Sequence, residues 1–383
     1  MSDIALILVI RPDVIRASKI IKLLDEFDEF KLDFIWSGQH YSSNMKDIFF
    51  SQLNVTKPDY EFNINGMTDA SIVSSTINSL SEHFNSHSYK AVIFLGDTNT
   101  VMGAVAAAQH NIPIIHIEGC MRSYDWRMPE EKYRTMVDHL SDRIYAYLDN
   151  YKIQGLNEGI GENRIMVTGN PIVDIIFENR NLFNQGADLI DKTAKDIIKE
   201  DYVLATCHRR ENILDEGSFR SIINLVNTVQ DKIIFPMGYK TQEQLNEFGL
   251  KINKNVYITN PIGYIEFMYL LDNSKYVISD SGTVVEEACI LGVPSVQARK
   301  STERPEVYEV RASVKCDPTS KVRYDKIISD VEKLIGTKWE HPFGTGDASE
   351  KIAKDIRNMY IDDSFRRHNR ESYPFSTDRS YLS

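Results

Sequence analysis

Carboxylate side chains follow apolar segments in the first half of the sequence. Asp97 and Glu118 each come directly after a short apolar run, and Glu130 opens a helical stretch. Because the carboxyl ends of parallel strands meet at one edge of a sheet, we expect these three side chains in one cleft. Crowded carboxylates have separated pKa values, which divides acid and base roles between them. Structural alternatives stay open: Asp97 as a helix N-cap, and one of Glu130 and Glu131 as the neutraliser of a helix dipole.

Basic and small residues follow the apolar runs of the second half. His208 and Arg209 end the first of these runs, where a His flanked by arginines favours phosphate contact. The turn at Ser281 and Gly282 would let backbone amides reach phosphate oxygens, and Glu287 can accept the two hydroxyls of a ribose. A solvated loop is the alternative for each segment alone. Their joint placement at strand ends favours a nucleotide ligand.

Arginines also stand at other turns of the predicted sheets. Arg11 follows the first strand and precedes Pro12, and Arg16 lies one helical turn further on. A guanidinium beside a helix N-terminus suits a pyrophosphate, because both supply donors to the same anion. Pro12 at a helix start is also a common capping arrangement, so this motif could be structural. Arg304 lies in another charged turn after a strand.

Two doubly wound parallel sheets would position these residues. Short β-branched runs alternate with amphipathic stretches almost throughout, which is typical of α/β folds with helical crossovers. We predict strands at 4–10, 32–37, 90–96, 112–117, 142–147, 164–168, 202–207, 231–236, 255–259, 276–280 and 294–298. We predict helices at 69–87, 100–110, 130–140, 217–230 and 283–292. The polar segment around 170–195 is the expected domain boundary.

Composition limits the class of protein. A chain of 383 residues is long enough for two hydrophobic cores. The net charge of −11 argues against a general nucleic-acid or membrane-surface binder, and no apolar run reaches membrane-spanning length. The four cysteines are far apart and fit neither a disulfide framework nor a zinc pattern. We therefore expect a cytoplasmic protein without a metal, and the sequence lacks the Gly-x-Gly-x-x-Gly turn of a dinucleotide cofactor site after the first strand.

Ten short segments, in order, resemble the non-hydrolysing UDP-N-acetylglucosamine 2-epimerase family. They are Arg11-Pro12, 37–41, Gly96-Asp97-Thr98, 116–119, Pro129-Glu130-Glu131, Thr168-Gly169-Asn170, 208–212, Asp280-Ser281-Gly282, Glu286-Glu287 and 302–306. The resemblance implies a glycosyltransferase-B architecture, with two Rossmann-like domains facing across a cleft. The domains would span 1–170 and 171–346, and 347–383 would hold a helix that returns to the first domain, followed by a tail.

The resemblance also implies site residues and a reaction. Asp97, Glu118 and Glu130 would be the acid and base carboxylates, and His208 would assist departure of UDP. The substrate and its UDP group would be bound by Arg11, Arg16, Gln39, Arg122, Arg134, Arg209, Ser281, Gly282, Glu287 and Arg304. The family eliminates UDP from a UDP-2-acetamido sugar through a glycal and adds it back, with no cofactor. A homodimer and a role in polysaccharide biosynthesis are implied as well.

Some residues depart from the family pattern and bear on the substrate. Val9 and Ile10 stand where Gly-Thr is usual, Arg16 replaces a lysine, and no His follows the strand before Gly238. The Ser-Gly-Thr turn and the short segment 122–129 resemble members that act on UDP-2-acetamido-2,6-dideoxy-L-hexoses. UDP-GlcNAc is therefore the first expected substrate, and such a deoxy sugar is the second.

Other functions stay open at this level. A UDP-sugar glycosyltransferase would share the UDP-binding half but would not need three carboxylates in the first half. A hydrolysing epimerase would release UDP and the free sugar. A non-catalytic UDP-sugar sensor is the alternative from another class, motivated by the departures at Ile10, Arg16 and Gly238.

Overall fold

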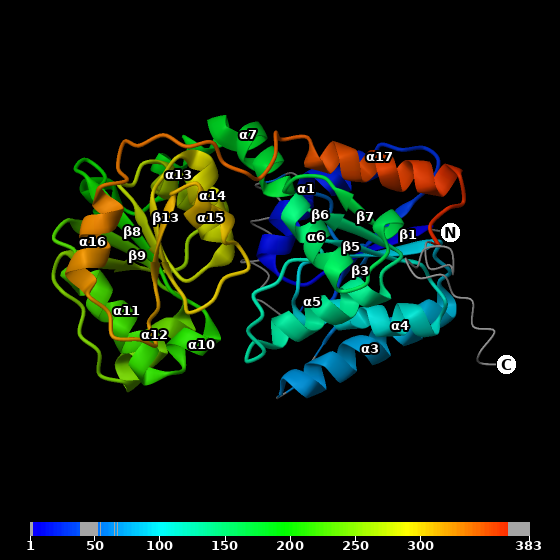
Figure 1. Cartoon of the computed structure of the whole chain (residues 1–383), viewed down its shortest axis with the longest axis horizontal. Coiled ribbons are helices and arrows are strands. Elements are labelled where there is room, and N and C mark those ends of the chain that lie inside the picture. Colours follow the sequence, from blue (N-terminus) through cyan, green and yellow to red (C-terminus); the bar gives the residue numbers. More distant parts are fainter. Residues whose placement is uncertain (1–2, 39–52, 54, 65, 67, 367–383) are drawn as a thin grey trace. The chain divides into compact units, whose positions relative to one another are not determined.

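The structure is a computed structural model that describes residues 3–38, 53, 55–64, 66 and 68–366 (Figure 1). The chain divides into two compact units. The first contains residues 1–175 together with 343–383, and the second contains 176–342. Each unit carries its own parallel sheet with helical crossovers, which confirms the predicted α/β class with two Rossmann-like folds.

The first unit contains a seven-stranded parallel sheet in the order β3-β2-β1-β4-β5-β6-β7. Its strands are β1 (Ile4–Leu8), β2 (Leu32–Trp36), β3 (Tyr60–Glu61), β4 (Ala91–Leu95), β5 (Ile114–Ile117), β6 (Arg143–Ala146) and β7 (Ile165–Val167). β1, β4 and β5 are buried along their whole length, as expected for central strands covered on both faces. The strand order reverses between β1 and β4, and ligands of such sheets bind outside the carboxyl ends at this point.

The helices of the first unit include one from the end of the described chain. They are α1 (Arg11–Asp25), α3 (Asp69–Ser86), η1 (Asn99–Gly103), α4 (Ala104–Gln109), α5 (Pro129–Leu140), α6 (Asp149–Asn157), η2 (Glu162–Arg164) and α17 (Ala348–Ile361). α17 packs along α1 (Figure 1). Its first turn is capped by Asp174, which accepts from the backbone of Ser349 at 2.9 Å. Asp355 accepts from Arg143 and Tyr145 of β6 at 2.8 and 2.9 Å.

The second unit contains a six-stranded parallel sheet in the order β10-β9-β8-β11-β12-β13. Its strands are β8 (Tyr202–Thr206), β9 (Lys232–Pro236), β10 (Val256–Thr259), β11 (Val277–Ser279), β12 (Ser295–Ala298) and β13 (Ser313–Cys316). Its helices are α8 (Gly186–Leu189), α9 (Lys192–Ile197), α10 (Arg210–Ile213), α11 (Glu216–Thr228), α12 (Tyr239–Glu247), α13 (Tyr264–Asp272), α14 (Gly282–Leu291), α15 (Glu306–Glu309) and α16 (Tyr324–Glu332). Helix α7 (Pro171–Phe183) spans the limit between the units. The switch point lies between β8 and β11.

All eleven predicted strands are present, and the described residues contain two further strands that the sequence pattern did not predict. β3 has two residues, too few for a sequence pattern, and pairs only at the edge of its sheet. β13 is an edge strand of the second sheet, and its sequence SVKC places an exposed lysine between partly buried and buried residues. The apolar pattern of both is weak because edge strands are covered less completely. Over the described residues, no helix combines the length and apolar character needed to cross a membrane.

Candidate active site

The first unit places two carboxylates at neighbouring strand ends. Asp97 comes two residues after β4 and Glu118 directly after β5, and the two strands pair in register. The intervening Gly96 has a φ of 81°, which glycine adopts freely, whereas Glu118 has a φ of 75°. For a glutamate this backbone conformation costs about 1–3 kcal/mol. The turn at Glu118 is therefore imposed by its surroundings.

Glu118 forms an ion pair with Arg16 of α1. The hydroxyl of Tyr147 donates to Oε2 of Glu118 at 3.2 Å. Arg16 is 5% exposed and Glu118 is 6% exposed, so little solvent screens the attraction. The structure thus brings together two residues that the sequence assigned to separate tasks, phosphate binding and proton transfer.

Asp13 supports Arg16 from the same helix. Its Oδ1 lies 2.8 Å from Nη2 of Arg16, and its Oδ2 accepts from the backbone of Ile10 at 3.4 Å. Burial raises the pKa of Asp13 to about 6, against the opposing effect of Arg16. The sequence predicted no role for Asp13, because its pairing with Arg16 one turn away is visible only in the folded helix.

Asp97 forms an ion pair with Arg134 of α5. The same guanidinium contacts Glu131 at 2.9 Å between Nη1 and Oε2. Arg134 is 2% exposed and its charge is divided between two carboxylates. Asp97 is more accessible, with a quarter of its side chain exposed.

The two glutamates at the start of α5 have different surroundings. Glu131 is buried and accepts from the backbone and hydroxyl of Ser123 and from the backbone of Tyr124, at 2.7–3.0 Å. Glu130 is half-buried. Of the two residues, Glu131 is therefore the structural one, because it closes the segment before α5 onto the first turn of that helix.

Arg122 is buried beside two other carboxylates. It lies 2.7 Å from Asp138 through Nη1, and it contacts Glu158 at 2.9 and 2.6 Å through Nε and Nη2. Arg11 is the first residue of α1, and its side chain, like Gln39, lies outside the described part of the chain.

In the second unit, the loop after β8 is organised by Asp280, which follows β11 and is fully buried. Its carboxylate accepts from the backbone of His208 and Arg209 at 2.9–3.2 Å and from the amide of Asn212 at 3.2 Å. Burial alone would raise the pKa of Asp280, but His208 and these hydrogen bonds hold the pKa below its usual value. The sequence pattern included Asp280 beside Ser281 and Gly282 but predicted no function for its carboxylate.

His208 and Arg209 project from this loop. The side chain of His208 is 57% exposed, with Nδ1 at 3.8 Å from Oδ1 of Asp280. Nη2 of Arg209 lies 3.8 Å from Oε1 of Glu303. The imidazole of His208 is therefore open to a ligand, whereas Asp280 fixes the backbone of this loop.

A short turn after Asp280 opens α14. Ser281 is the N-cap and accepts from the backbone of Val284 at 3.4 Å. A Cβ on Gly282 would lie 2.6 Å from Nη1 of Arg304, so glycine allows the guanidinium to approach the helix N-terminus.

Arg304 and Glu287 are both buried beside this helix. Nε of Arg304 lies 2.7 Å from Oε1 of Glu286, and the guanidinium also pairs with Glu303. Glu287 lies beside Tyr264, where burial and this carboxylate raise the pKa of the tyrosine hydroxyl. Arg304 therefore stands within a group of carboxylates, which makes it a support for the turn at Gly282.

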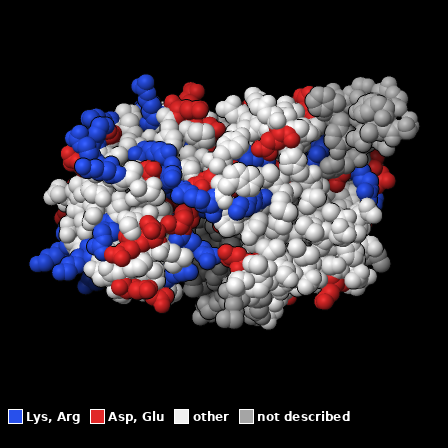
Figure 2. All heavy atoms as spheres, turned by 60° about the horizontal axis from the view of Figure 1, so that its bottom comes forward, with Lys and Arg blue, Asp and Glu red and all other residues white. Residues whose placement is uncertain are grey.

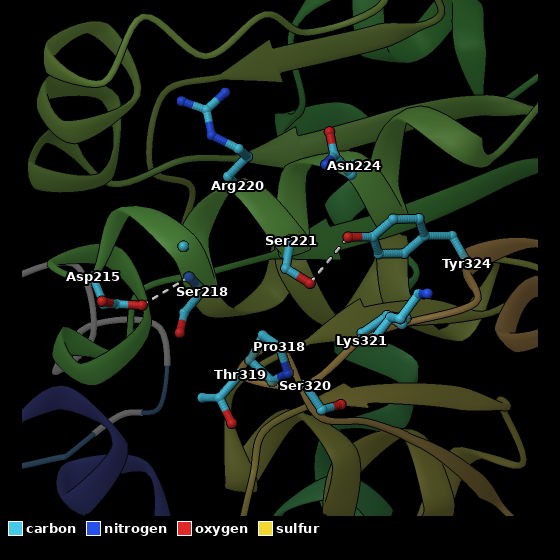
Figure 3. Close-up of a pocket in the computed structure, with 12 residues that line it drawn as sticks. Asp215, Ser218, Arg220, Ser221, Asn224, Pro318, Thr319, Ser320, Lys321 and Tyr324 are labelled. Carbon is cyan, nitrogen blue, oxygen red and sulfur yellow. Dashed lines mark hydrogen bonds between the residues drawn. The ribbon is translucent and has the colours of Figure 1, made fainter.

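A separate surface hollow of about 450 Å³ lies in the second unit, between α11 and the segment after β13 (Figure 3). Asp215 caps α11 there by accepting from Ser218 at 2.8 Å, and Tyr324 donates to Ser221 at 3.2 Å. None of the described residues that the sequence assigned to the site lines this hollow. The predicted site is therefore defined by its strand ends and not by this cavity.

Charge is distributed differently at the surface and at the site. In the view of Figure 2, Lys and Arg alternate with Asp and Glu over the second unit without forming one basic face. Among the residues that the structure describes, no group of three or more His, Cys, Asp or Glu side chains is arranged to hold a metal ion.

Comparison with known proteins agrees with these observations. The family model described as UDP-N-acetylglucosamine 2-epimerase matches residues 22–357. A protein of that name from Methanocaldococcus jannaschii is 35% identical, over 92% of this chain and 98% of the relative. Its crystal structure in complex with UDP-GlcNAc and UDP has a TM-score of 0.84, covering 93% of this chain and 99% of that one, at 34% identity.

A relative with a different substrate name is also similar. UDP-2,3-diacetamido-2,3-dideoxy-D-glucuronate 2-epimerase of Pseudomonas aeruginosa is 31% identical, over 91% of this chain and 98% of the relative. The match of the family model and the identities above 30% over nearly full lengths decide the assignment. The chain belongs to the UDP-N-acetylglucosamine 2-epimerase family.

Proposed function

We propose that the chain inverts carbon 2 of a UDP-linked 2-acetamido sugar by eliminating UDP and adding it back. A base removes the C2 proton while the bond between C1 and the diphosphate oxygen breaks, and the diphosphate keeps the electron pair. The glycal then takes UDP back at C1 and receives a proton on the opposite face of C2. The observation that carries this proposal is the set of carboxylates at one sheet edge, with Asp97 and Glu118 each paired to a buried arginine.

Asp97, Glu118 and Glu130 carry the acid and base roles in this proposal. A neighbouring cation favours the ionised form of a carboxylate, which the base that takes the C2 proton requires. Arg134 supplies this charge to Asp97, and Arg16 supplies it to Glu118. A substrate phosphate would compete with Glu118 for Arg16, so binding of the diphosphate would release Glu118 for proton transfer.

The second unit would bind the nucleotide. The backbone amides at Ser281 and Gly282 open an α-helix of ten residues, which suits a phosphate group. Glu287 would accept from the ribose hydroxyls, and His208 and Arg209 would stabilise the charge that develops on departing UDP. Arg304 would contribute indirectly, by supporting the turn at Gly282 that meets the phosphate. Arg11 and Gln39 remain predicted ligands of the substrate.

Arg122 would support the turn at Glu118 rather than meet the substrate. Its guanidinium is divided between Asp138 and Glu158, and it is 4% exposed. Removing Arg122 itself would leave the fully buried Asp138 without this cation, and breaking a buried ion pair costs about 3–5 kcal/mol. This burial argues for a structural contribution.

Turnover in heavy water tests the proposal. We expect UDP-GlcNAc to give UDP-ManNAc with deuterium at C2, read by NMR, without added NAD or metal. Free sugar and UDP as the products would indicate a hydrolysing epimerase. Absence of label at C2 with every UDP-2-acetamido sugar tried would favour a glycosyltransferase or a sensor.

UDP-GlcNAc is the proposed substrate, and a UDP-2-acetamido-2,6-dideoxy-L-hexose is the alternative. A Cβ built on Gly238 meets no atom within 4 Å, so there is open space in the segment after this strand, where many family members have a histidine. A site without a partner for a sugar hydroxyl tolerates loss of that hydroxyl. The comparison is kcat/KM for UDP-GlcNAc against UDP-2-acetamido-2,6-dideoxy-L-mannose and its L-talo isomer. A preference for UDP-GlcNAc of at least about tenfold, or about 1.4 kcal/mol, would exclude the alternative.

We also expect a cytoplasmic homodimer that serves polysaccharide biosynthesis, as the family resemblance implies. Sedimentation velocity at micromolar concentration tests the oligomeric state. A monomer at concentrations that give full activity would contradict this expectation.

A further inference from the structure

A buried group of charged residues lies beneath the carboxylate edge of the first unit and is not used by the proposed reaction. His116 of β5 and Asp138 of α5 are both fully buried. Nδ1 of His116 lies 2.7 Å from Oδ1 of Asp138. Nε2 of the same ring lies 2.8 Å from the carbonyl oxygen of Gly96. The imidazole therefore bridges the turn after β4 and the last part of α5.

Counting donors determines the charge of this ring. A backbone carbonyl only accepts, so Nε2 must carry a hydrogen to bond Gly96. Asp138 accepts at Oδ2 from the backbone of Cys120 at 3.0 Å and from Arg122 at 2.7 Å. Burial alone would raise the pKa of Asp138, but its hydrogen bond and attraction to His116 and its contacts with Arg122 hold that pKa below the usual value. An ionised Asp138 only accepts, so Nδ1 must carry a hydrogen as well.

Charged residues surround this ring on several sides. Asp138 and Glu158 both pair with Arg122, and the buried Arg164 donates to the backbone carbonyl of Asp138 at 2.8 Å. A neutral ring would leave the carbonyl of Gly96 or the carboxylate of Asp138 without its donor. An unmet acceptor in a buried site costs about 1–3 kcal/mol, so the hydrogen bonds themselves favour the imidazolium.

The same residues hold the backbone on either side of the proposed acid and base groups. Gly96 directly precedes Asp97, and Cys120 follows Glu118 by two residues. Glu118 and Cys120 both have positive φ values, of 75° and 63°. Such conformations persist where surrounding contacts determine them fully.

Further contacts leave this turn little freedom. The backbone amides of Glu118 and Gly119 both donate to the carbonyl of Tyr145 at 3.1 Å. A Cβ on Gly119 would lie 2.2 Å from Cγ2 of Ile144 and 2.8 Å from Oδ1 of Asp138. Asp138 thus contacts the backbone of the turn at residues 118–120. Through His116 it is also linked to the neighbouring turn at Gly96.

We propose that His116 and Asp138 form a buried imidazolium–carboxylate pair that positions the backbone of Asp97 and Glu118 together. Both are positioning residues, since they act through the two turns and meet no substrate. The expected effect of this pair on the turnover rate rests on the proposed function. The charge of the His116 ring and the position of the backbone can be tested whether or not the proposed function is correct.

NMR of the full chain, with labelled histidine and labelled backbone amides, tests the pair. We expect one histidine with hydrogens on both ring nitrogens, and His116→Gln should remove its signals. Asp138→Asn should return the ring to one protonated nitrogen, and it should shift the amide signals of Asp97 and Glu118. Turnover should fall at least about tenfold in kcat, with KM within about threefold of wild type.

Asp142→Asn is the matched control. Asp142 is also a buried aspartate that accepts from a backbone amide of β5, that of Ile114 at 3.0 Å, but at the other end of the strand. We expect this variant to keep the doubly protonated ring, the two amide signals and kcat, even if it lowers the melting temperature. A neutral His116 ring in the wild-type protein would overturn the charge assignment. Unshifted amide signals in a folded Asp138→Asn protein would overturn the positioning role, whereas an inactive wild-type protein would refute only the proposed reaction.

Discussion

The sheet edges of the two units use charged residues in opposite ways. In the first unit, buried arginines turn toward the carboxylates of the edge, as Arg134 does toward Asp97. In the second, the buried carboxylate of Asp280 holds the backbone of a loop, and the ring of His208 stays exposed. One topology thus presents acid and base groups in the first unit and hydrogen-bond donors in the second. The difference shows that the role of a charged residue follows from its partner more than from its type.

The largest effect is expected at the first edge, for Glu118→Gln. The amide keeps the size of the side chain but cannot take a proton, so kcat should fall by about 10³-fold. Arg16 loses one of its two ion-pair partners and keeps Asp13, so UDP affinity measured by calorimetry should be unchanged or higher. Glu162→Gln, which removes only an exposed pair with Lys152, is the control and should match wild type. A kcat within tenfold of wild type would remove Glu118 from the acid and base groups.

The next effect is expected at the second edge, for His208→Ala. Stabilisation of the departing diphosphate grows as its charge develops, so kcat should fall by about 10²-fold while UDP affinity changes by less than about threefold. Calorimetry on UDP and initial rates on the same preparation separate the two quantities. Lost UDP affinity with an unchanged kcat would reverse the assignment and make His208 a ground-state ligand.

A smaller effect, on stability, is expected for Asp13 of the first edge. Its pKa rises from 3.8 to about 6 on folding, so the folded protein binds this proton more tightly than the unfolded chain. Its contribution to the free energy of unfolding therefore falls as the pH rises from about 4 to 6, and then levels off. Between pH 4.5 and 6.5 the loss should be about 2 kcal/mol.

The measurement is urea unfolding of wild type and Asp13→Asn at both pH values. His83, whose pKa is lowered to about 4 first by burial, titrates in the same window with the opposite sign. It is present in both proteins, so its contribution cancels in the difference between them. An equal pH dependence of the two proteins would show that Asp13 does not titrate there.

The smallest effect is expected for Gly282→Ala at the second edge. The added methyl group would meet the guanidinium of Arg304 at 2.6 Å, so either this buried guanidinium or the turn must shift, and UDP affinity should fall by about tenfold. Gly238→Ala is the matched control, because a Cβ there meets nothing within 4 Å. Equal UDP affinities of the two variants would show that Arg304 does not limit the turn.

The sequence predicted the strand ends of both units because buried parallel strands are apolar along their whole length. Asp97, Glu118 and His208 lie within two residues of the ends of such strands, and for this reason they could be singled out. The pairing of these residues could not be predicted. That Arg16 meets Glu118, or that Asp280 accepts from the backbone of His208, depends on elements far apart in the sequence.

Glu130 and Glu131, which are neighbours at the start of α5, show the same limit of prediction from the sequence. The sequence indicated that one of them would be structural, but both suit the first turn of a helix. Only the folded segment before α5, which directs the amides of Ser123 and Tyr124 at Glu131, separates them. The predicted ligand Gln39 lies outside the described residues.

The placement of α17 on α1 has a consequence for synthesis of the chain. The first unit is interrupted by residues 176–342 and is completed only when α17 emerges. At about 5–20 residues per second, the ribosome needs roughly ten to thirty seconds to make the inserted stretch. The second unit is continuous and can finish folding during this time. Meanwhile the side of α1 that α17 will cover, and the ring of Phe30 that packs on Tyr360 at 5.1 Å, stay uncovered until α17 has been made. Nascent chains at this stage are the natural clients of a chaperone that shields apolar surface.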